Sequence, residues 1–106
     1  MTSNEVRQLV EREIANRWDH TNLHSVDLRT SVIEPRSIKF VTVNAGQSEE
    51  EIEAWLVLLQ DPTVQLGYGI AYEEGRGEFG LVQFANGYDP FLIGLYGGFF
   101  DAFDAM

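Results

Sequence analysis

The sequence predicts an α+β domain: an antiparallel meander of about five strands, with an N-terminal helix and a short C-terminal helix. Three observations lead to this prediction. Apolar residues recur at helical spacing near the start of the chain, small and large residues alternate between positions 66 and 84, and an apolar segment closes the chain. A length of 106 residues is typical of one domain with its own core, so we expect residues 1–106 to form a single domain.

A capping box and an apolar stripe indicate the first helix. Thr2 and Glu5 have the spacing at which a threonine hydroxyl and a glutamate carboxylate cap the first helical turn. Apolar residues then follow at intervals of three or four, and we expect the helix to end between positions 19 and 22. The stripe consists of Val6, Leu9, Val10, Ile14 and Trp18.

The next segment contains one clear strand. Residues 38–43 are rich in β-branched side chains and are bounded by Pro35 and by the turn-forming run 44–46, so we predict a strand there. Pro35 interrupts any helix and favours extended geometry at Glu34. We expect residues 25–34 to be irregular, with at most a short edge strand around Val32.

Residues 48–60 are compatible with a helix or with a strand. Ser48 and Glu51 have capping-box spacing, and four apolar residues after them fit a helical face. However, positions 54–59 are six consecutive apolar residues, which a strand buried on both faces explains better. We therefore predict a strand over 53–60, ended by Asp61 and Pro62, and an acidic hairpin loop over 47–51.

Residues 66–84 have the pattern of a β-hairpin. The polar, glycine-rich run 73–78 separates two alternating segments, and a two-residue loop at Gly75 and Arg76 would set the register. In that register one face carries the pairs Tyr72–Phe79 and Ile70–Leu81. The other face pairs small with large residues, as Gly69 with Val82 and Gly67 with Phe84.

The last segment predicts a strand followed by a helix. Residues 86–90 are expected to form a loop, and the apolar run 91–96 to form a strand covered on both faces. Gly97 and Gly98 end that strand. The closing helix should dock an apolar stripe on the sheet while its aspartates face solvent; the stripe consists of Phe99, Phe100, Phe103 and Met106.

The charge of the chain is strongly asymmetric. Residues 1–39 contain six basic and six acidic side chains, whereas residues 40–106 contain eleven acidic side chains and one basic side chain, Arg76. The net charge of −10 therefore belongs to the second part, and it should repel nucleic acid and anionic lipid and attract a basic protein. Residues 1–10 lack the apolar centre of a signal peptide and no run is long enough to span a membrane, so we expect a cytoplasmic protein.

The sequence gives little evidence of motifs for catalysis, metal binding or cofactor binding. Residues 75–80 match the dinucleotide-binding pattern G-x-G-x-x-G, but a strand follows them instead of the helix that such a site needs. His20 and His24 straddle the expected helix end, and no third ligand accompanies them at metal-binding spacing. There is no cysteine to act as a nucleophile or a ligand. We expect neither a metal nor a cofactor, and no enzymatic activity.

The acidic turns are the stronger functional lead. The meander should bring residues 47–53 and 86–90 to one end of the sheet and residues 73–78 to the opposite end, and the sequence does not choose between the ends. The alternative is that charged turns only keep the protein soluble, but −10 exceeds the magnitude of about 2–8 which that role requires of a small domain. The candidate partner-binding residues are Glu49, Glu50, Glu51, Glu53, Glu73, Glu74, Glu78 and Asp89, with Tyr88 or Trp55 as an aromatic anchor.

One resemblance points in the same direction. The closing segment 91–106 (FLIGLYGGFFDAFDAM), which follows Phe79-Gly80-Leu81, resembles the C-termini of small bacterial α+β proteins. In size, acidity and layout the chain is similar to immunity proteins of bacterial contact-dependent or polymorphic toxin systems. This resemblance implies a cytoplasmic protein that binds and blocks a cognate toxin, often a basic nuclease, and it assigns no individual residues.

Three functional hypotheses follow. The first is a non-catalytic inhibitor whose acidic loops mask a basic cognate toxin. The second is a small-ligand-binding or enzymatic domain with a pocket near Tyr88, Asp89 and His24, where Tyr88 and Pro90 partly desolvate the Asp89 carboxylate; in its simpler interpretation, Asp89 is a turn residue before a proline. The third is a homo-oligomeric accessory protein that associates through a strand edge or a glycine-rich face.

Overall fold

A computed structural model describes residues 1–43 and 49–106 of the chain. The helices are α1 (Ser3–Ile14), α2 (Leu28–Ser31) and α3 (Phe99–Ala105). The strands are β1 (Val32–Val43), β2 (Glu49–Asp61), β3 (Leu66–Glu73), β4 (Glu78–Phe84) and β5 (Phe91–Gly97). The α+β class, the antiparallel meander and both terminal helices are thus confirmed.

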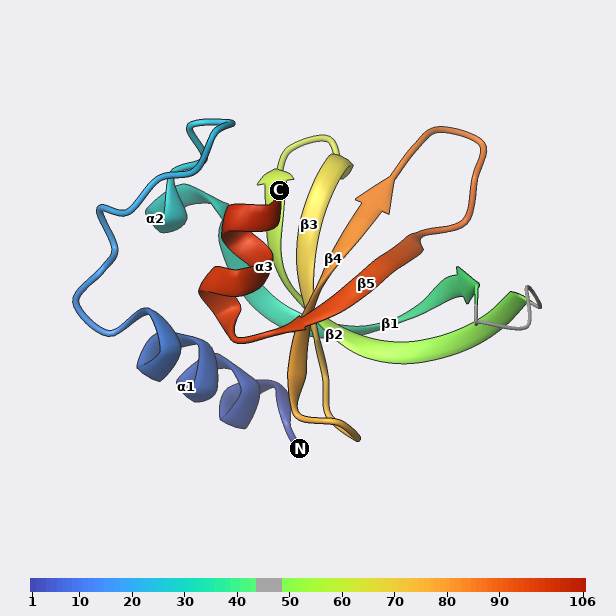
Figure 1. Ribbon diagram of the computed structural model, residues 1–106, viewed down its shortest axis with the longest axis horizontal. Helices are drawn as coiled ribbons and strands as arrows, with labels where there is room; N and C mark the ends of the chain where they lie inside the picture. Colours follow the sequence, from blue (N-terminus) through green and yellow to red (C-terminus); the bar gives the residue numbers. More distant parts are fainter. Residues whose placement is uncertain (44–48) are drawn as a thin grey trace.

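The meander rolls up into a barrel, which the sequence did not predict. Consecutive strands pair antiparallel from β1 to β5. The barrel closes where β1 meets β5 in parallel, at Val41 and Phe91, and the Val41 backbone nitrogen donates to the Pro90 carbonyl at 2.9 Å. Figure 1 shows α1 and α3 on one side of the sheet and the β1–β2 hairpin reaching away from them. Among the described residues, the helices therefore lie away from the end of the barrel that this hairpin forms.

Two cores form because successive side chains of a strand point to opposite faces. The first core lies between the helices and the sheet, and the second consists of strand residues that face one another inside the barrel. Tyr72 pairs with Phe79 in the first core, and Ala71 and Val82 lie in the second. The predicted hairpin register is confirmed on both faces. The largest fully buried side chains of the first core are Phe99, Phe103, Ile14, Leu28, Leu58 and Ile70, and those of the second are Phe40 and Leu56.

The hairpin turn is wider than predicted. The ladder ends at the pair Glu73 and Glu78, and the four residues 74–77 turn the chain, with the Gly77 nitrogen donating to the Glu73 carbonyl at 2.9 Å. A two-residue loop at Gly75 and Arg76 would give the same register, so the error in loop length leaves the facing pairs unchanged.

The second strand confirms one prediction and corrects another. Residues 53–60 are a strand and not a helix, but β2 begins already at Glu49. The pairs Val43–Glu49 and Val41–Glu51 continue the β1–β2 ladder, so the predicted loop is wrong for residues 49–51; residues 47 and 48 lie outside the described part. The glutamates tolerate strand geometry because their side chains are exposed while their backbone groups pair.

The region before β1 differs most from the prediction. Helix α1 ends at Ile14 and not between 19 and 22, because Ala15 takes φ 52° and turns the chain, although Trp18 still packs against the first core. Residues 28–31 form a short helix, and β1 starts at Val32 and runs through Pro35. The proline fits because the register shifts between Val32 and Arg36.

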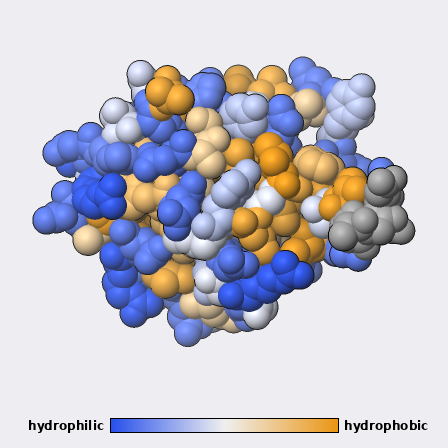
Figure 2. Space-filling view, in the orientation of Figure 1, coloured by the Kyte–Doolittle hydropathy of each residue, from blue (hydrophilic) through white to orange (hydrophobic). Residues whose placement is uncertain are grey.

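The last strand is less covered than predicted. Ile93 is 41 % exposed and Tyr96 is 42 % exposed, so β5 is not buried on both faces. Figure 2 shows apolar side chains gathered over β5 in the middle of this face, between hydrophilic flanks. The predicted coverage is wrong because only one side of β5 is covered: Leu92 and Leu95 pack in the second core, whereas Ile93 and Tyr96 remain exposed.

Candidate functional site

Three carboxylates from two segments gather near the barrel closure. Glu49 and Asp89 line a hollow of about 420 Å³, and Glu51 and Asp89 line an adjoining hollow of about 170 Å³. Val41 contributes to both hollows. We call Glu49, Glu51 and Asp89 the acidic cluster.

Strand geometry places these side chains together. Glu49 and Glu51 are two residues apart on β2 and therefore project from the same face. Asp89 comes from the β4–β5 loop, which is held against β1 by the hydrogen bond between Val41 and Pro90. The predicted proximity of residues 47–53 to the 86–90 loop is thus confirmed for Glu49, Glu51 and Asp89.

Aromatic and apolar groups surround the acidic cluster. Tyr88 is 81 % exposed and lies beside Phe91 and Val41 in the larger hollow. Lys39 lines the smaller hollow. Within residues 1–43 and 49–106, no ion pair involves a carboxylate of the acidic cluster. The cluster combines unpaired negative charge with an exposed ring, which a binding surface for a cationic protein requires.

Three other predicted glutamates have intramolecular partners. Glu53 accepts from the Ser37 hydroxyl at 2.9 Å, and Glu73 accepts from the backbone nitrogens of Gly75 and Arg76 at 2.9 and 2.8 Å. Glu74 accepts from the Met1 amino group at 2.9 Å and from the Trp55 indole at 3.3 Å. The hydrogen bond from the amino group is the main cause that lowers the pKa of the Glu74 carboxyl, and the indole adds to it. These contacts give the three glutamates structural roles.

The two remaining glutamates lie along a groove. Glu50 and Glu78 line it together with Arg76, and its volume is about 360 Å³. Val43, Ile52 and residues 92–95 supply its apolar part. The expected separation of the acidic turns into two ends is incomplete, because β2 is long enough for Glu50 to reach Glu78 and for Glu53 to line a hollow with Glu74.

The two aromatic candidates differ in exposure. Tyr88 is exposed, whereas Trp55 is half-buried and packs against the first core while its indole nitrogen donates to Glu74. Tyr88 is therefore the candidate for an aromatic anchor, and Trp55 has a structural role. Sequence analysis missed Lys39, Val41 and Phe91 as neighbours of the acidic cluster, because the parallel contact of β1 with β5 has no local sequence pattern.

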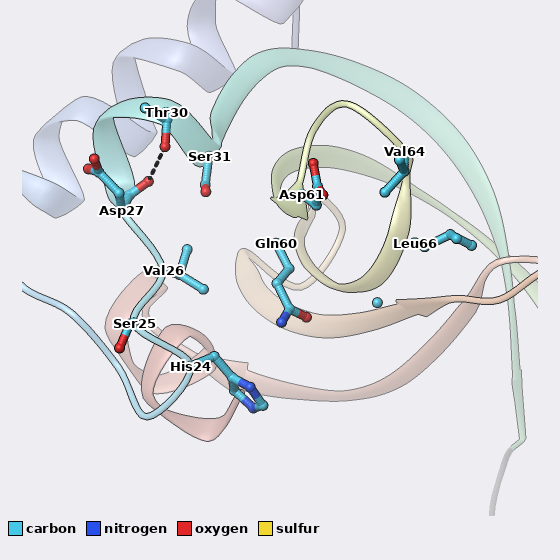
Figure 3. A pocket seen from close by; sticks show the side chains of 11 residues that line it. His24, Ser25, Val26, Asp27, Thr30, Ser31, Gln60, Asp61, Val64 and Leu66 are labelled. Carbon is cyan, nitrogen blue, oxygen red and sulfur yellow. Dashed lines mark hydrogen bonds between the residues drawn. The ribbon is translucent and has the colours of Figure 1, made fainter.

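A separate cavity of about 560 Å³ lies between the segment before β1 and the β2–β3 turn. Figure 3 shows His24, Ser31 and Gln60 around it. His24 lines this cavity, whereas Tyr88 and Asp89 line the hollow at the barrel closure. The hypothesis of one pocket shared by Tyr88, Asp89 and His24 therefore does not match the structure.

The residues considered for metal binding are dispersed. The His20 Nε2 atom lies 2.8 Å from an Asp104 oxygen, and Asp19 pairs with Arg29 at 2.6 Å. Asp27 caps α2 by accepting from the Arg29 nitrogen, and the His24 ring lies 5.8 Å from the Tyr68 ring. In the part of the chain that the structure describes, no group of three or more histidines and carboxylates is arranged to hold a metal ion.

Comparisons with known proteins found no similar protein. No protein-family model matches the chain, and neither a curated protein nor a solved structure is significantly similar to it. Among the helices of the described residues, none combines the length and apolar content needed to cross a membrane. The function is therefore inferred from the surface of the protein.

Proposed function

We propose that this protein is a non-catalytic binding protein that neutralises a basic partner, in the manner of an immunity protein that blocks a toxin. The observation that carries the proposal is the acidic cluster of Glu49, Glu51 and Asp89 around the exposed Tyr88. A net charge of −10 adds a long-range field that steers a cationic surface toward the protein.

The cluster supports binding better than the β3–β4 turn does. Glu73 and Glu74 already accept hydrogen bonds within the molecule, so a partner would have to replace those contacts. The cluster has no ion pair to break within the described residues, and its hollows offer Val41 and Phe91 as apolar contacts. Lysine or arginine side chains of the partner would meet the carboxylates, while an apolar side chain packs beside Tyr88.

The partner we propose is a basic protein, for instance a toxin that acts on nucleic acid. A surface that binds polyanions must be positive, so an acidic inhibitor can occupy it directly. The inhibitor then acts by occlusion and needs no catalytic group. We place this activity in the cytoplasm, where the toxin would act.

The test is affinity capture from a lysate of the source organism, followed by binding measurements with the captured protein. We expect a captured protein of basic isoelectric point whose affinity falls about 30- to 1,000-fold when Glu51→Gln and Asp89→Asn are combined, since each lost charge contact costs about 1–2 kcal/mol. Affinity should also decrease with added salt.

A matched control removes two charges elsewhere. Glu11→Gln with Asp19→Asn changes the net charge equally but affects only exposed pairs with Arg7 and Arg29. Equal weakening by both double variants would show that only net charge matters and would reject the cluster as the binding site. Capture of exclusively neutral or acidic proteins would reject the proposed function.

A further inference from the structure

The cavity beside α2 is separate from the acidic cluster and has polar groups with no hydrogen-bond partner among the described residues. Its volume of about 560 Å³ is in the range of small-molecule sites. In Figure 3 the Ser31 hydroxyl and the Val26 side chain point from the α2 side toward the space in front of the Gln60 amide, and the His24 ring lies below it. The Asp27 carboxylate points away.

Ser31 is the most informative residue of this cavity. It is only 3 % exposed, the one buried polar side chain among the described residues. No hydrogen bond of its hydroxyl occurs within residues 1–43 and 49–106, although every side-chain nitrogen or oxygen there that is sealed from solvent has a partner. The hydroxyl must therefore reach the open space of the cavity. A hydroxyl that has no protein partner and faces the cavity can donate a hydrogen bond to a ligand there or accept one from it.

Gln60 supplies a second unused group. Its Oε1 atom accepts a hydrogen bond from the Tyr68 backbone nitrogen at 3.0 Å, which fixes the orientation of the amide. The NH₂ group therefore faces away from Tyr68, with two donors and no partner in the described part of the chain. Gly67 makes this placement possible, because a Cβ atom at Gly67 would lie 2.7 Å from Oε1.

The hydrogen-bonding groups decide the chemical class of the ligand. An anion would find no lysine or arginine in the lining and would approach the Asp61 carboxylate. A primary ammonium has only donors and would face the two donors of the Gln60 amide. A neutral hydroxyl compound can accept from Gln60, donate to Asp61 and do either with Ser31. Val26 and Val64 offer apolar surface for its C–H groups.

We propose that this cavity binds a neutral polyhydroxylated ring of monosaccharide size. Ser31 and Gln60 position it by hydrogen bonds, Asp61 accepts from a further hydroxyl, and the His24 ring lines the cavity beside it. This site is independent of the proposed partner-binding function, because it shares no lining residue with the hollows of the acidic cluster.

The test is a titration of the ¹⁵N-labelled protein, observed by two-dimensional NMR. The probes are glucose, galactose, mannose, N-acetylglucosamine and myo-inositol, each raised to about 50 mM because small neutral ligands bind weakly. Putrescine and inorganic phosphate serve as the cationic and anionic probes. We expect at least one neutral probe to shift the amide signals of Ser31, Gln60 and Gly67 saturably, with no such shift by putrescine or phosphate.

Variants make the assignment specific. Ser31→Ala removes the hydroxyl, and Gln60→Glu keeps the oxygen that accepts from Tyr68 but removes the donors, so each should weaken binding about five- to tenfold. Ser25→Ala is the matched control, because Ser25 lines the same cavity while its hydroxyl points away in Figure 3. The proposal is overturned if no neutral probe shifts these signals, if putrescine or phosphate shifts them instead, or if Ser31→Ala and Gln60→Glu bind as the Ser25→Ala control does.

Discussion

The carboxylate of Glu13, near the end of α1, accepts a hydrogen bond at 3.0 Å from the backbone nitrogen of Phe99, the first residue of α3. Gly98 precedes α3 and has no side chain to cap it, so the helix depends on acceptors from elsewhere. Asp101 supplies one, accepting from the Gly98 nitrogen at 2.8 Å. Glu13 supplies another and thereby connects the two terminal helices.

Replacing Glu13 should weaken this connection. We expect Glu13→Ala to lower the free energy of unfolding by about 1 kcal/mol, the usual effect of losing a helix cap. Glu13→Gln keeps an oxygen acceptor and should cost less. Urea denaturation measures both, and Glu11→Ala is the control because the Glu11 carboxylate is exposed and meets Arg7 only at 4.0 Å. Equal effects of Glu13→Ala and Glu11→Ala would contradict the capping role.

Asn22 holds the segment after α1 against the end of α3. Its amide nitrogen donates to the Phe103 carbonyl at 3.0 Å, and its oxygen accepts from the backbone nitrogens of His24 and Val26 at 3.0 and 3.3 Å. Asn22→Ala should lower the free energy of unfolding by about 1–3 kcal/mol, because these partly buried groups lose their partners. Asn22→Asp keeps the acceptor, so its thermal denaturation midpoint should lie between those of Asn22→Ala and the unmodified protein. A thermal midpoint of Asn22→Ala equal to that of the unmodified protein would rule out this role.

Gly80 lies where β4 closely approaches β5. A Cβ atom there would stand 2.6 Å from the Gly94 carbonyl oxygen and 2.9 Å from methyl groups of Leu92 and Leu95. Gly80→Ala should therefore destabilise the protein by about 1–3 kcal/mol through overpacking. Gly94→Ala on the neighbouring strand is the matched control, because its Cβ would meet only Tyr96 atoms at ordinary contact distances of 3.7–3.8 Å. Equal free energies of unfolding for Gly80→Ala and Gly94→Ala in urea would contradict this prediction, because they would show that the barrel accommodates the extra methyl group without losing stability.

These glycines also show why much of the sheet was predictable. The alternation of small and large residues over 66–84 encodes the register directly, because a shift by one residue would exchange the two faces. The run of six apolar residues at 54–59 likewise distinguishes a buried strand from an amphipathic helix. Both features are local, and the structure confirms both.

The features that were missed depend on residues far apart in the chain. Barrel closure joins Val41 to Phe91, and the α3 cap joins Glu13 to Phe99, and neither contact has a local pattern. The extension of β2 to Glu49 was missed because consecutive glutamates favour a loop when their pairing with β1 is ignored. The cavity at Ser31 has no local pattern either, because it joins a segment that the sequence predicts to be irregular to the end of β2 and the start of β3.

The candidate binding surface was only partly predictable. Charge counting identified the acidic residues, but it could not separate Glu73 and Glu74, which hold the molecule together, from Glu51 and Asp89, which do not pair within the described residues. That distinction needs the positions of hydrogen-bond donors. It changes which substitutions test binding and which test folding.

The turn between β2 and β3 should make the stability of the protein depend on pH. Asp61 accepts from the Thr63 hydroxyl at 2.6 Å and from the Thr63 nitrogen at 3.0 Å, and these hydrogen bonds, the hydroxyl first, lower the pKa of the Asp61 carboxyl below its usual value. A lowered carboxyl pKa stabilises the folded protein at pH values above the pKa of the unfolded chain, about 3.9. This contribution is lost as the pH falls through the folded-state pKa.

Thr63→Ala removes the hydroxyl and leaves the backbone contact. We expect the pKa of Asp61, followed by NMR of its carboxyl carbon, to rise toward the ordinary value in Thr63→Ala. The unmodified protein should be more stable than Thr63→Ala at pH 6, and this difference should shrink below about pH 4 as Asp61 becomes protonated. Thr21→Ala, at another exposed threonine, should change neither quantity. An Asp61 pKa that is the same with and without the Thr63 hydroxyl would refute the assignment of the shift to that bond.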